Sequence, residues 1–255
     1  MTALSAASLT VAVDGKTLID GIDLVVQPGE MIAVLGPNGA GKSTLLAALA
    51  GLRAPTSGSV TLDGRALSTW PARDLAAARA YLPQNGALEW PLTVARVVAL
   101  GRLPLAGLWG EARSDAAHAV DAALAEMDAL ILKDRIATTL SGGELARVLL
   151  ARAIVGDPRI ILADEPLAGL DPRHQLDALA RLRMLSDNGR AIVIAMHDLD
   201  LAARFATRVV LLSLGKVIAD GPPQETLTAE RIAEAFHVEA RVGADESGAW
   251  VRLLR

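Results

Sequence analysis

The sequence feature that most constrains this chain is the segment GPNGAGKST at residues 36–44, which has the pattern Gly, four residues, Gly-Lys-Ser/Thr. The apolar run Met31 to Leu35 precedes it and predicts a buried parallel strand. Apolar residues recur on one face from Leu45 to Leu49 and predict a helix that stops at Gly51. A strand, a glycine loop and a helix in this order form a cradle for phosphate.

The residues of this loop have distinct predicted roles. Its glycines permit backbone angles that turn successive NH groups inward, and the helix start adds a partial positive charge. We expect Lys42 to reach the β and γ phosphates and the Ser43 hydroxyl to take a place on Mg²⁺. A glycine-rich turn before an ordinary helix is the alternative, but the lysine, the hydroxyl and both flanking elements disfavour it. The predicted phosphate contacts are Gly36, Pro37, Asn38, Gly39, Ala40, Gly41, Lys42, Ser43 and Thr44.

Composition limits the class of protein. The 255 residues suffice for one large α/β domain with an inserted subdomain. Although 52% of residues are hydrophobic, no uncharged apolar run approaches the ~20 residues of a membrane span. No positive residue precedes Lys16, which argues against a secretory signal, and cysteine is absent, which excludes disulfides and thiolate metal sites. We therefore expect a soluble cytoplasmic protein.

Charge and aromatic content argue against nucleic acid as a partner. The formal net charge is -4 with a pI of about 5.6, so the chain lacks the basic surface that binds a phosphate backbone. Aromatic residues make up only 3%, so stacking platforms for bases are scarce.

The pattern of apolar residues predicts three regions. Short apolar pieces interrupted by turn residues indicate an N-terminal antiparallel hairpin and a further strand at Ser59 to Leu62. From Asn85 to about Leu140, helical spacing replaces strand-like runs, with Thr93 as a helix N-cap and Gly101 as a helix end. The hairpin pieces are Leu9 to Val13, Leu18 to Ile19 and Leu24 to Val26, and the helical runs are Val94 to Leu100 and Ala116 to Met127.

The α/β pattern then resumes. We expect helices after Ser141 and from Asp171-Pro172 to near Gly189, strands at Ile160 to Ala163 and Ala191 to Met196, and a small hairpin within Val238 to Leu254. The predicted fold class is α/β with a mainly parallel sheet, an N-terminal antiparallel β subdomain and an inserted α-helical subdomain. The predicted boundaries are 1–240 for the main domain, 85–140 for the insertion and 241–255 for a short C-terminal hairpin or tail.

Polar residues follow two of the predicted buried strands. Asp164 and Glu165 end one strand and His197 ends another, at the edge where open α/β sheets hold ligands. A solvated strand end is the alternative for the acidic pair, but the phosphate loop also follows a parallel strand and so lies at the same edge. We expect Asp164 to hold Mg²⁺, Glu165 to accept a proton from the attacking water, and His197 to contact the γ phosphate.

A second glycine pair begins a predicted helix at Ser141, Gly142 and Gly143. The NH groups and the helix dipole there favour an anion. Ser141 to Glu144 also fits a capping box, and the spacing alone favours that simpler interpretation.

Taken together, these residues resemble the ATP-binding subunits of ABC transporters, and the resemblance covers nearly the whole chain. The matching segments, in the family's order, are Gly36 to Ser43, Gln84, Leu140 to Glu144 (LSGGE), Ile160 to Glu165, Ala168 to Asp171 and His197. The resemblance implies a P-loop nucleoside triphosphatase core that uses ATP and Mg²⁺. It also implies a head-to-tail homodimer, in which the loop at Lys42 of one copy and the segment Ser141 to Glu144 of the other enclose each ATP.

The resemblance assigns three further residues. Gln84 joins Mg²⁺ and the γ phosphate to the helical subdomain, so it counts both as a metal ligand and as a catalytic residue. Lys42 is also among the implied catalytic residues. Asp171 makes a contact across the dimer. Val13 occupies the position of the family's aromatic that stacks on adenine, and no aromatic occurs before Trp70. This departure predicts apolar contact in place of stacking, with a loss of about 1 kcal/mol in nucleotide binding.

The resemblance also implies partners. Two such subunits dock on a separate membrane permease, on the inner face of the cell membrane, and act indirectly with a substrate-binding protein. Three stretches look most like importers of ferric siderophore, haem or cobalamin. They are Tyr81 to Gln84, Thr93 to Pro104 (TVARVVALGRLP) and Asp171 to Asp177 (DPRHQLD).

Other functions stay open at this level. An importer for another small solute uses the same ATP motifs. A chromosome-maintenance ATPase needs a long coiled coil between Lys42 and Ser141, and a ribosome-associated ATPase usually carries two cassettes in one chain, so both fit poorly. A regulatory module that binds ATP without hydrolysis is disfavoured because Glu165 and His197 are both present.

Overall fold

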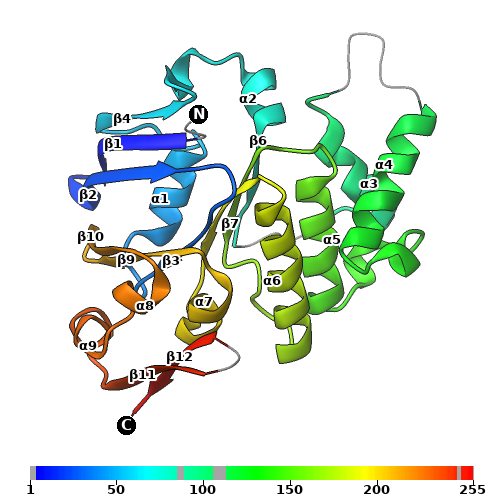
Figure 1. The fold of residues 1–255 in the computed structure, drawn as a ribbon. Coiled ribbons are helices and arrows are strands. Elements are labelled where there is room, and N and C mark those ends of the chain that lie inside the picture. The colour runs from blue at the N-terminus through cyan, green and yellow to red at the C-terminus, as the bar shows by residue number, and fades with distance from the viewer. Residues whose placement is uncertain (1–3, 85–88, 106–112, 246–247, 255) are drawn as a thin grey trace.

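The computed structural model describes residues 4–84, 89–105, 113–245 and 248–254 (Figure 1). A six-stranded sheet runs through the centre of the molecule. A smaller antiparallel sheet lies on one side of it and a group of helices on the other. No helix in these ranges is long and apolar enough to cross a membrane.

The central sheet has the strand order β10-β9-β3-β8-β7-β6. All neighbouring strands are parallel except β10, which pairs antiparallel with β9 at one edge. Strands β3, β7 and β8 are buried along their whole length, which explains why their sequences read as continuous apolar runs. The strands are β3 (Met31–Leu35), β6 (Arg79–Leu82), β7 (Ile160–Asp164), β8 (Ala191–Ala195), β9 (Arg208–Ser213) and β10 (Lys216–Gly221).

The predicted N-terminal antiparallel subdomain forms a second sheet with the order β2-β1-β4-β5. Its first two strands form the expected hairpin, and Val13 pairs with Lys16 at the turn. The strands are β1 (Leu4–Val13), β2 (Lys16–Val26), β4 (Ser57–Leu62) and β5 (Arg65–Ala66). The short helical turn η1 (Leu67–Thr69) follows β5.

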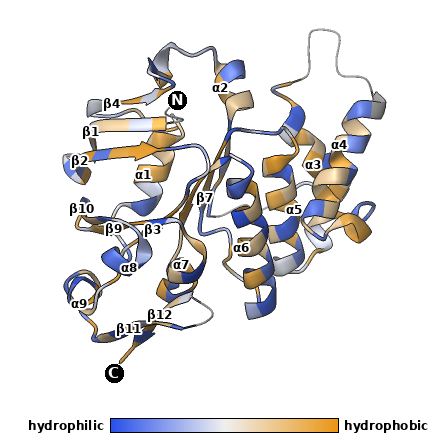
Figure 2. Ribbon diagram, in the orientation of Figure 1, coloured by the Kyte–Doolittle hydropathy of each residue, from blue (hydrophilic) through white to orange (hydrophobic). Residues whose placement is uncertain are grey.

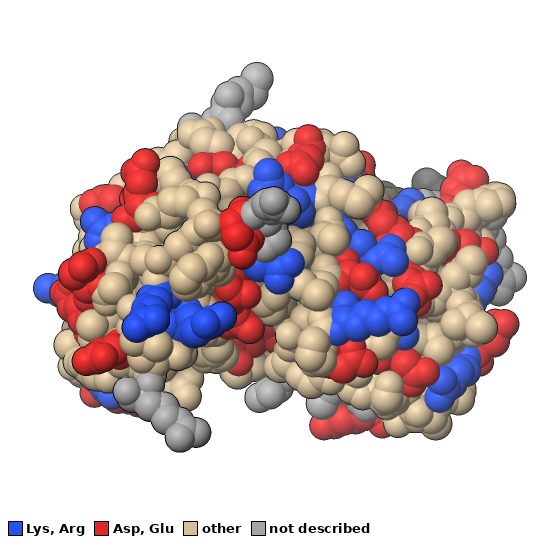
Figure 3. All heavy atoms as spheres, turned by 60° about the horizontal axis from the view of Figure 1, so that its bottom comes forward, with Lys and Arg blue, Asp and Glu red and all other residues tan. Residues whose placement is uncertain are grey.

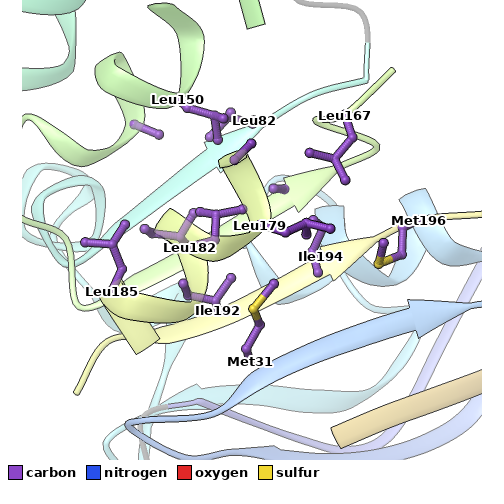
Figure 4. Close-up of a cluster of buried hydrophobic side chains, with 14 of the residues drawn as sticks. Met31, Leu82, Leu150, Leu167, Leu179, Leu182, Leu185, Ile192, Ile194 and Met196 are labelled. Atoms are coloured by element: carbon purple, nitrogen blue, oxygen red, sulfur yellow. The ribbon is translucent and has the colours of Figure 1, made fainter. Parts of the chain in front are cut away.

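Helices cover both faces of the central sheet. Helix α1 (Lys42–Leu49) packs into the apolar cluster shared with the antiparallel sheet. On the other face, α5 (Gly142–Ile154), α6 (Pro172–Asp187) and α7 (Leu199–Phe205) pack into a second cluster. Figure 4 shows Leu179 and Leu182 of α6 beside Ile192 and Ile194 of β8. In Figure 2 the core strands are mainly hydrophobic, whereas hydrophobic and hydrophilic residues alternate along the helices.

The helical region contains α3 (Val94–Ala99) and α4 (Arg113–Glu126), which pack with α5. Thr93 caps α3 as predicted, accepting a hydrogen bond from Arg96 N at 3.4 Å. Helix α3 ends at Ala99, two residues before the end predicted at Gly101, and the chain continues in the turn η2 (Leu100–Arg102). A side chain at Gly101 would collide with the Arg152 carbonyl of α5, so glycine is required there for close packing.

Sequence reasoning also missed α2 (Ala72–Ala78) and the edge strand β6, which were not predicted. Both are short and only partly buried, so neither leaves a clear apolar period. Two further helical turns, η3 (Leu130–Leu132) and η4 (Ala137–Thr139), lead into α5.

The chain ends with α8 (Pro223–Thr226), α9 (Ala229–Phe236) and the hairpin β11 (Ala240–Asp245) and β12 (Gly248–Leu253). Asp200 of α7 accepts a hydrogen bond from Val251 N at 3.1 Å, which ties this hairpin to the main body. The division into domains at 85–140 and 241–255 remains a prediction, and residue 85 lies outside the described residues.

Candidate nucleotide-binding site

The predicted motifs meet at one edge of the central sheet. The glycine loop follows β3, Gln84 follows β6, Asp164 and Glu165 end β7, and His197 follows β8. These four strands are mutually parallel, so their carboxyl ends point the same way. Segments that are far apart in the sequence therefore converge on a single site.

Two glycines fix the course of the loop. Gly36 has a φ of 153°, and a Cβ there would collide with the Leu212 carbonyl of β9. Gly41 has a φ of 103°, and a Cβ there would lie 2.7 Å from a methyl carbon of Ile19 and 2.8 Å from the Leu18 carbonyl oxygen of β2. Only glycine adopts these angles without pushing the neighbouring strands away, so the loop is held close against both sheets.

Lys42 is the buried cation of the site, with a side chain only 6% exposed. Its Nζ donates hydrogen bonds to the carbonyl oxygens of Gly36 at 2.7 Å and Pro37 at 3.2 Å. Burial lowers the pKa of Lys42, and the nearby carboxylates of Glu165 and Asp164 oppose that shift. The ammonium group thus already lies inside the loop where phosphate oxygens are expected.

Asp164 is the buried anion of the site, at 3% exposure. Burial raises the pKa of Asp164, and a hydrogen bond from the Ser43 hydroxyl is the largest opposing effect. Its Oδ1 has no hydrogen-bond partner within the described residues. A buried carboxylate oxygen without a partner, next to a hydroxyl, is a donor set suited to a hard cation. These two residues therefore fit Mg²⁺.

Glu165 brings three motifs together. Its Oε1 lies 2.5 Å from His197 Nε2, and its Oε2 accepts a hydrogen bond from Gln84 Nε2 at 2.7 Å. The residue has a φ of 51°, in the left-handed region, and its NH donates to the Ala195 carbonyl of β8 at 3.0 Å. This conformation costs about 1–3 kcal/mol and turns the carboxylate out of the strand toward the other two side chains.

The helix start at Ser141 is an internally satisfied capping box. Ser141 Oγ accepts from Glu144 N at 3.3 Å, and Glu144 Oε2 accepts from Ser141 N at 2.8 Å. The latter bond is the main reason that the pKa of Glu144 is lowered. The capping box is confirmed, and anion binding by Ser141, Gly142 and Gly143 stays a prediction. Gly142 lines a cavity of about 360 Å³ together with Gln84 and Glu165.

Two residues with predicted ATP or dimer contacts, Asp171 and Val13, have no hydrogen bond to the residues around Glu165 among the bonds that the structure shows. Asp171 caps α6, and its Oδ1 accepts from His174 N at 2.9 Å; this bond is the first cause of the lowered pKa of Asp171. The carboxylate is exposed, as a contact across a dimer requires. Val13 is half-buried at the hairpin turn of the antiparallel sheet. Both roles remain predictions.

Sequence reasoning missed Arg152, which lines the same cavity as Gln84, Gly142 and Glu165. The signal was present in the sequence, because Arg152 interrupts a run of apolar residues from Val148 to Ile154 whose neighbours are buried. A charged residue inside such a run faces either solvent or a polar site.

Comparison with known proteins decides the family. A family model described as ABC transporter matches residues 19–168. This chain belongs to the ABC transporter family. A hemin import ATP-binding protein HmuV of Rhodopseudomonas palustris is 44% identical, with 96% of this chain and 92% of that protein aligned. HmuV of Gloeobacter violaceus is also 44% identical, over 94% of this chain and 89% of the relative.

Solved structures of ABC proteins share the fold. A metal-chelate type ABC transporter in an inward-facing conformation matches with a TM-score of 0.84 and 25% identity, covering 100% of this chain and 97% of that one. A dimeric bacterial ABC transporter cassette matches with a TM-score of 0.77 and 25% identity, over 86% of this chain and 98% of that one. The predicted ABC resemblance and P-loop fold class are confirmed, and this ABC protein is an ATP-binding ATPase.

Proposed function

We propose that this protein is the ATP-hydrolysing subunit of a membrane importer for haem or a chemically similar metal chelate. The observation that carries the hydrolytic part is the convergence on Glu165, whose two oxygens contact Gln84 and His197 beside a buried lysine. The similarity to hemin import ATP-binding proteins over almost the whole chain supports the cargo.

The loop at 36–44 would bind the triphosphate. Lys42 exchanges its hydrogen bonds to the Gly36 and Pro37 carbonyls for bonds to the β and γ phosphates, while the loop NH groups hold the remaining oxygens. Asp164, Ser43 and Gln84 are the residues that would hold Mg²⁺. When bound, the metal ion neutralises charge that develops on the phosphate oxygens.

Glu165 is the proposed general base. Its carboxylate accepts a proton from water as the water oxygen attacks the γ phosphorus and the bond to the β-γ bridging oxygen breaks, which yields ADP and phosphate. His197 holds Oε1 of this carboxylate and extends toward the γ phosphate. Gln84 holds Oε2 at the boundary with the helical region.

A head-to-tail homodimer would complete the site. The phosphate loop and α1 belong to one face of the central sheet, whereas α5 packs on the other. The exposed Ser141 nest of a second copy can therefore approach the triphosphate from outside, and Asp171 meets the opposing copy. The similarity to a dimeric ABC cassette supports this arrangement.

Transport requires a membrane partner, since the described helices include no membrane span. We infer that two copies dock on a permease at the inner face of the cell membrane and act indirectly with a substrate-binding protein. ATP-driven closure of the dimer then changes access through the permease, and hydrolysis resets it.

A reconstitution experiment tests this function. The protein is purified with its permease, placed in liposomes with the binding protein, and assayed for ATP hydrolysis in the presence of hemin, cobalamin or a ferric siderophore. We expect hemin to give the largest stimulation. Equal rates with all three would contradict haem as cargo, and stimulation only by an unrelated solute would favour the alternative importer. Absence of hydrolysis under every condition would contradict the enzymatic proposal.

A further inference from the structure

Arg135 binds the acidic residue that caps the Ser141 nest (residues 141–143). Its Nη1 donates a hydrogen bond to Glu144 Oε1 at 2.8 Å, and its Nη2 donates one to the Thr139 carbonyl oxygen at 3.3 Å. The turn η4 connects residue 135 to the nest, so the guanidinium group holds both ends of this connection. These two bonds therefore fix the start of α5 relative to the segment that precedes it.

The backbone of Arg135 is itself fixed by another helix. The Val94 NH at the start of α3 donates a hydrogen bond to the Arg135 carbonyl oxygen at 2.9 Å. An antiparallel bridge between Thr93 and Ile136 adds to this contact. Arg135 therefore reaches the Ser141 nest from a backbone that is anchored to α3.

An ion pair alone carries no function on this surface. Arg159 and Asp63 form a similar pair at 2.7 Å, with side chains 55% and 30% exposed, against 45% for Arg135 and 24% for Glu144. Figure 3 shows acidic and basic side chains mixed over the visible face. The pair of Arg135 differs in the position of its carboxylate, which lies at a helix start that is expected to receive an anion.

The carboxylate of Glu144 opposes an anion at that helix start. Its Oε2 accepts hydrogen bonds from the Ser141 NH at 2.8 Å and from the Ser141 hydroxyl at 3.0 Å. The first of these bonds is the main cause of the lowered pKa of Glu144, and Arg135 lowers that pKa further, so the carboxylate is charged at neutral pH. A triphosphate that approaches the nest therefore meets a negative charge and competes with it for the hydroxyl hydrogen of Ser141.

We propose that Arg135 is a positioning residue for ATP binding between two copies of this chain. Its guanidinium group balances the charge of Glu144, so that this residue caps α5 without repelling the triphosphate of the opposing copy. The Ser141 hydroxyl can then transfer its hydrogen bond from Glu144 Oε2 to a phosphate oxygen. This inference rests on the head-to-tail dimer of the proposed function, and it adds a residue outside the ATP motifs that decides how readily the dimer forms.

A double-mutant cycle tests this electrostatic role. Dimer formation is measured by sedimentation velocity with Mg-ATP, and every protein also carries Glu165→Gln, so that hydrolysis does not open the dimer. Arg135→Gln leaves the charge of Glu144 unbalanced, and we expect association to weaken about threefold at each of the two equivalent sites, the size of an exposed ion pair. The dissociation constant of the dimer should therefore rise about tenfold.

Glu144→Gln provides a rescue that a merely structural role of Arg135 would not give. Glutamine keeps an oxygen that accepts the bond from the Ser141 NH, but it carries no charge. We expect Arg135→Gln combined with Glu144→Gln to dimerise within about twofold of Glu144→Gln alone. Arg135→Lys keeps the positive charge and should weaken dimerisation by only about twofold.

Arg159→Gln is the matched control, because it breaks the similar pair with Asp63 and should leave dimerisation unchanged. Circular dichroism melting establishes that each variant is folded. The affinity of the monomer for Mg-ATP, measured at protein concentrations below the dimerisation range, should stay unchanged because the loop at 36–44 is intact. The defect of Arg135→Gln should also shrink at high salt, where exposed charges are screened.

Two results would overturn the proposal while leaving the proposed function intact. They are an Arg135→Gln variant that dimerises like its parent, and a defect that Glu144→Gln does not reverse. Absence of an ATP-dependent dimer in the parent protein would instead reject the head-to-tail arrangement of the proposed function, and this inference with it.

Discussion

The two glycine-rich helix starts of this protein use the same backbone chemistry in opposite ways. At the loop 36–44, Lys42 and Asp164 are buried, and Asp164 Oδ1 has no partner among the described residues. At Ser141, the NH groups are exposed, and Glu144 closes a complete capping box. The first site therefore keeps a buried carboxylate oxygen without a protein partner, whereas the polar groups of the second satisfy one another. The two helix starts thus differ in burial and in hydrogen-bond satisfaction.

The largest effect is expected from Glu165→Gln, which leaves both helix starts intact and removes the proposed general base. We expect hydrolysis to fall by about 10²–10⁴-fold, since an amide cannot accept the proton. ATP should still bind, and the dimer should persist because turnover no longer opens it. Phosphate release and light scattering measure the two results, and a monomer with ATP bound would contradict the shared site.

Lys42→Ala tests the buried helix start. The variant loses charge-assisted hydrogen bonds to the phosphates, so we expect nucleotide affinity to fall by about 10–100-fold. The loss should be independent of protein concentration because the loop belongs to one copy. Isothermal titration with Mg-ATP measures it, and Lys216→Ala, which pairs with Asp20 on the surface, serves as the control.

Ser141→Asp tests the exposed helix start without removing its cap. Aspartate is also a good N-cap, but it cannot donate the bond from Ser141 Oγ to Glu144 Oε2 at 3.0 Å and repels that carboxylate, so we expect a loss of about 1 kcal/mol in stability. The added negative charge should also repel a phosphate. We expect nucleotide affinity of the monomer to stay unchanged and ATP-induced dimerisation to fall by about tenfold or more. Unaltered dimerisation in sedimentation experiments would show that this nest does not contact the triphosphate.

Asp164→Asn should give the smallest of these effects. Unlike the other substitutions, it is expected to improve the measured property, which here is the stability of the folded state. Because burial raises the folded-state pKa, the protonated carboxyl adds stability that is present below the unfolded pKa and is lost as pH rises through the folded pKa. Without Mg²⁺, the asparagine variant should therefore be more stable than wild type at pH 7 and should melt at a higher Tm. The gain should vanish on acidification toward pH 4. A lower Tm for the variant at pH 7 would contradict the idea that the carboxylate is held at a cost.

The sequence predicted those parts of the site that rest on local patterns. The buried strands at Met31–Leu35 and Ala191–Ala195 and the capping box at Ser141 were all found where their patterns indicated. Strand β6 and helix α2 were missed because short, half-buried elements have no clear apolar period. The close contact between Gly101 and α5 was not predicted either, because it joins two segments that are distant in the sequence.

By itself, the sequence determined the family, the phosphate loop and the sheet edge, because spacing along the chain encodes strand, glycine turn and helix directly. Only the tertiary structure decided that Gln84 and His197 hold the two oxygens of Glu165, that Asp164 Oδ1 lacks a partner among the described residues, and that Arg135 binds Glu144. These facts depend on which side chains from distant segments become neighbours and on how far burial removes those side chains from water. Neither can be read from the order of residues within a short segment.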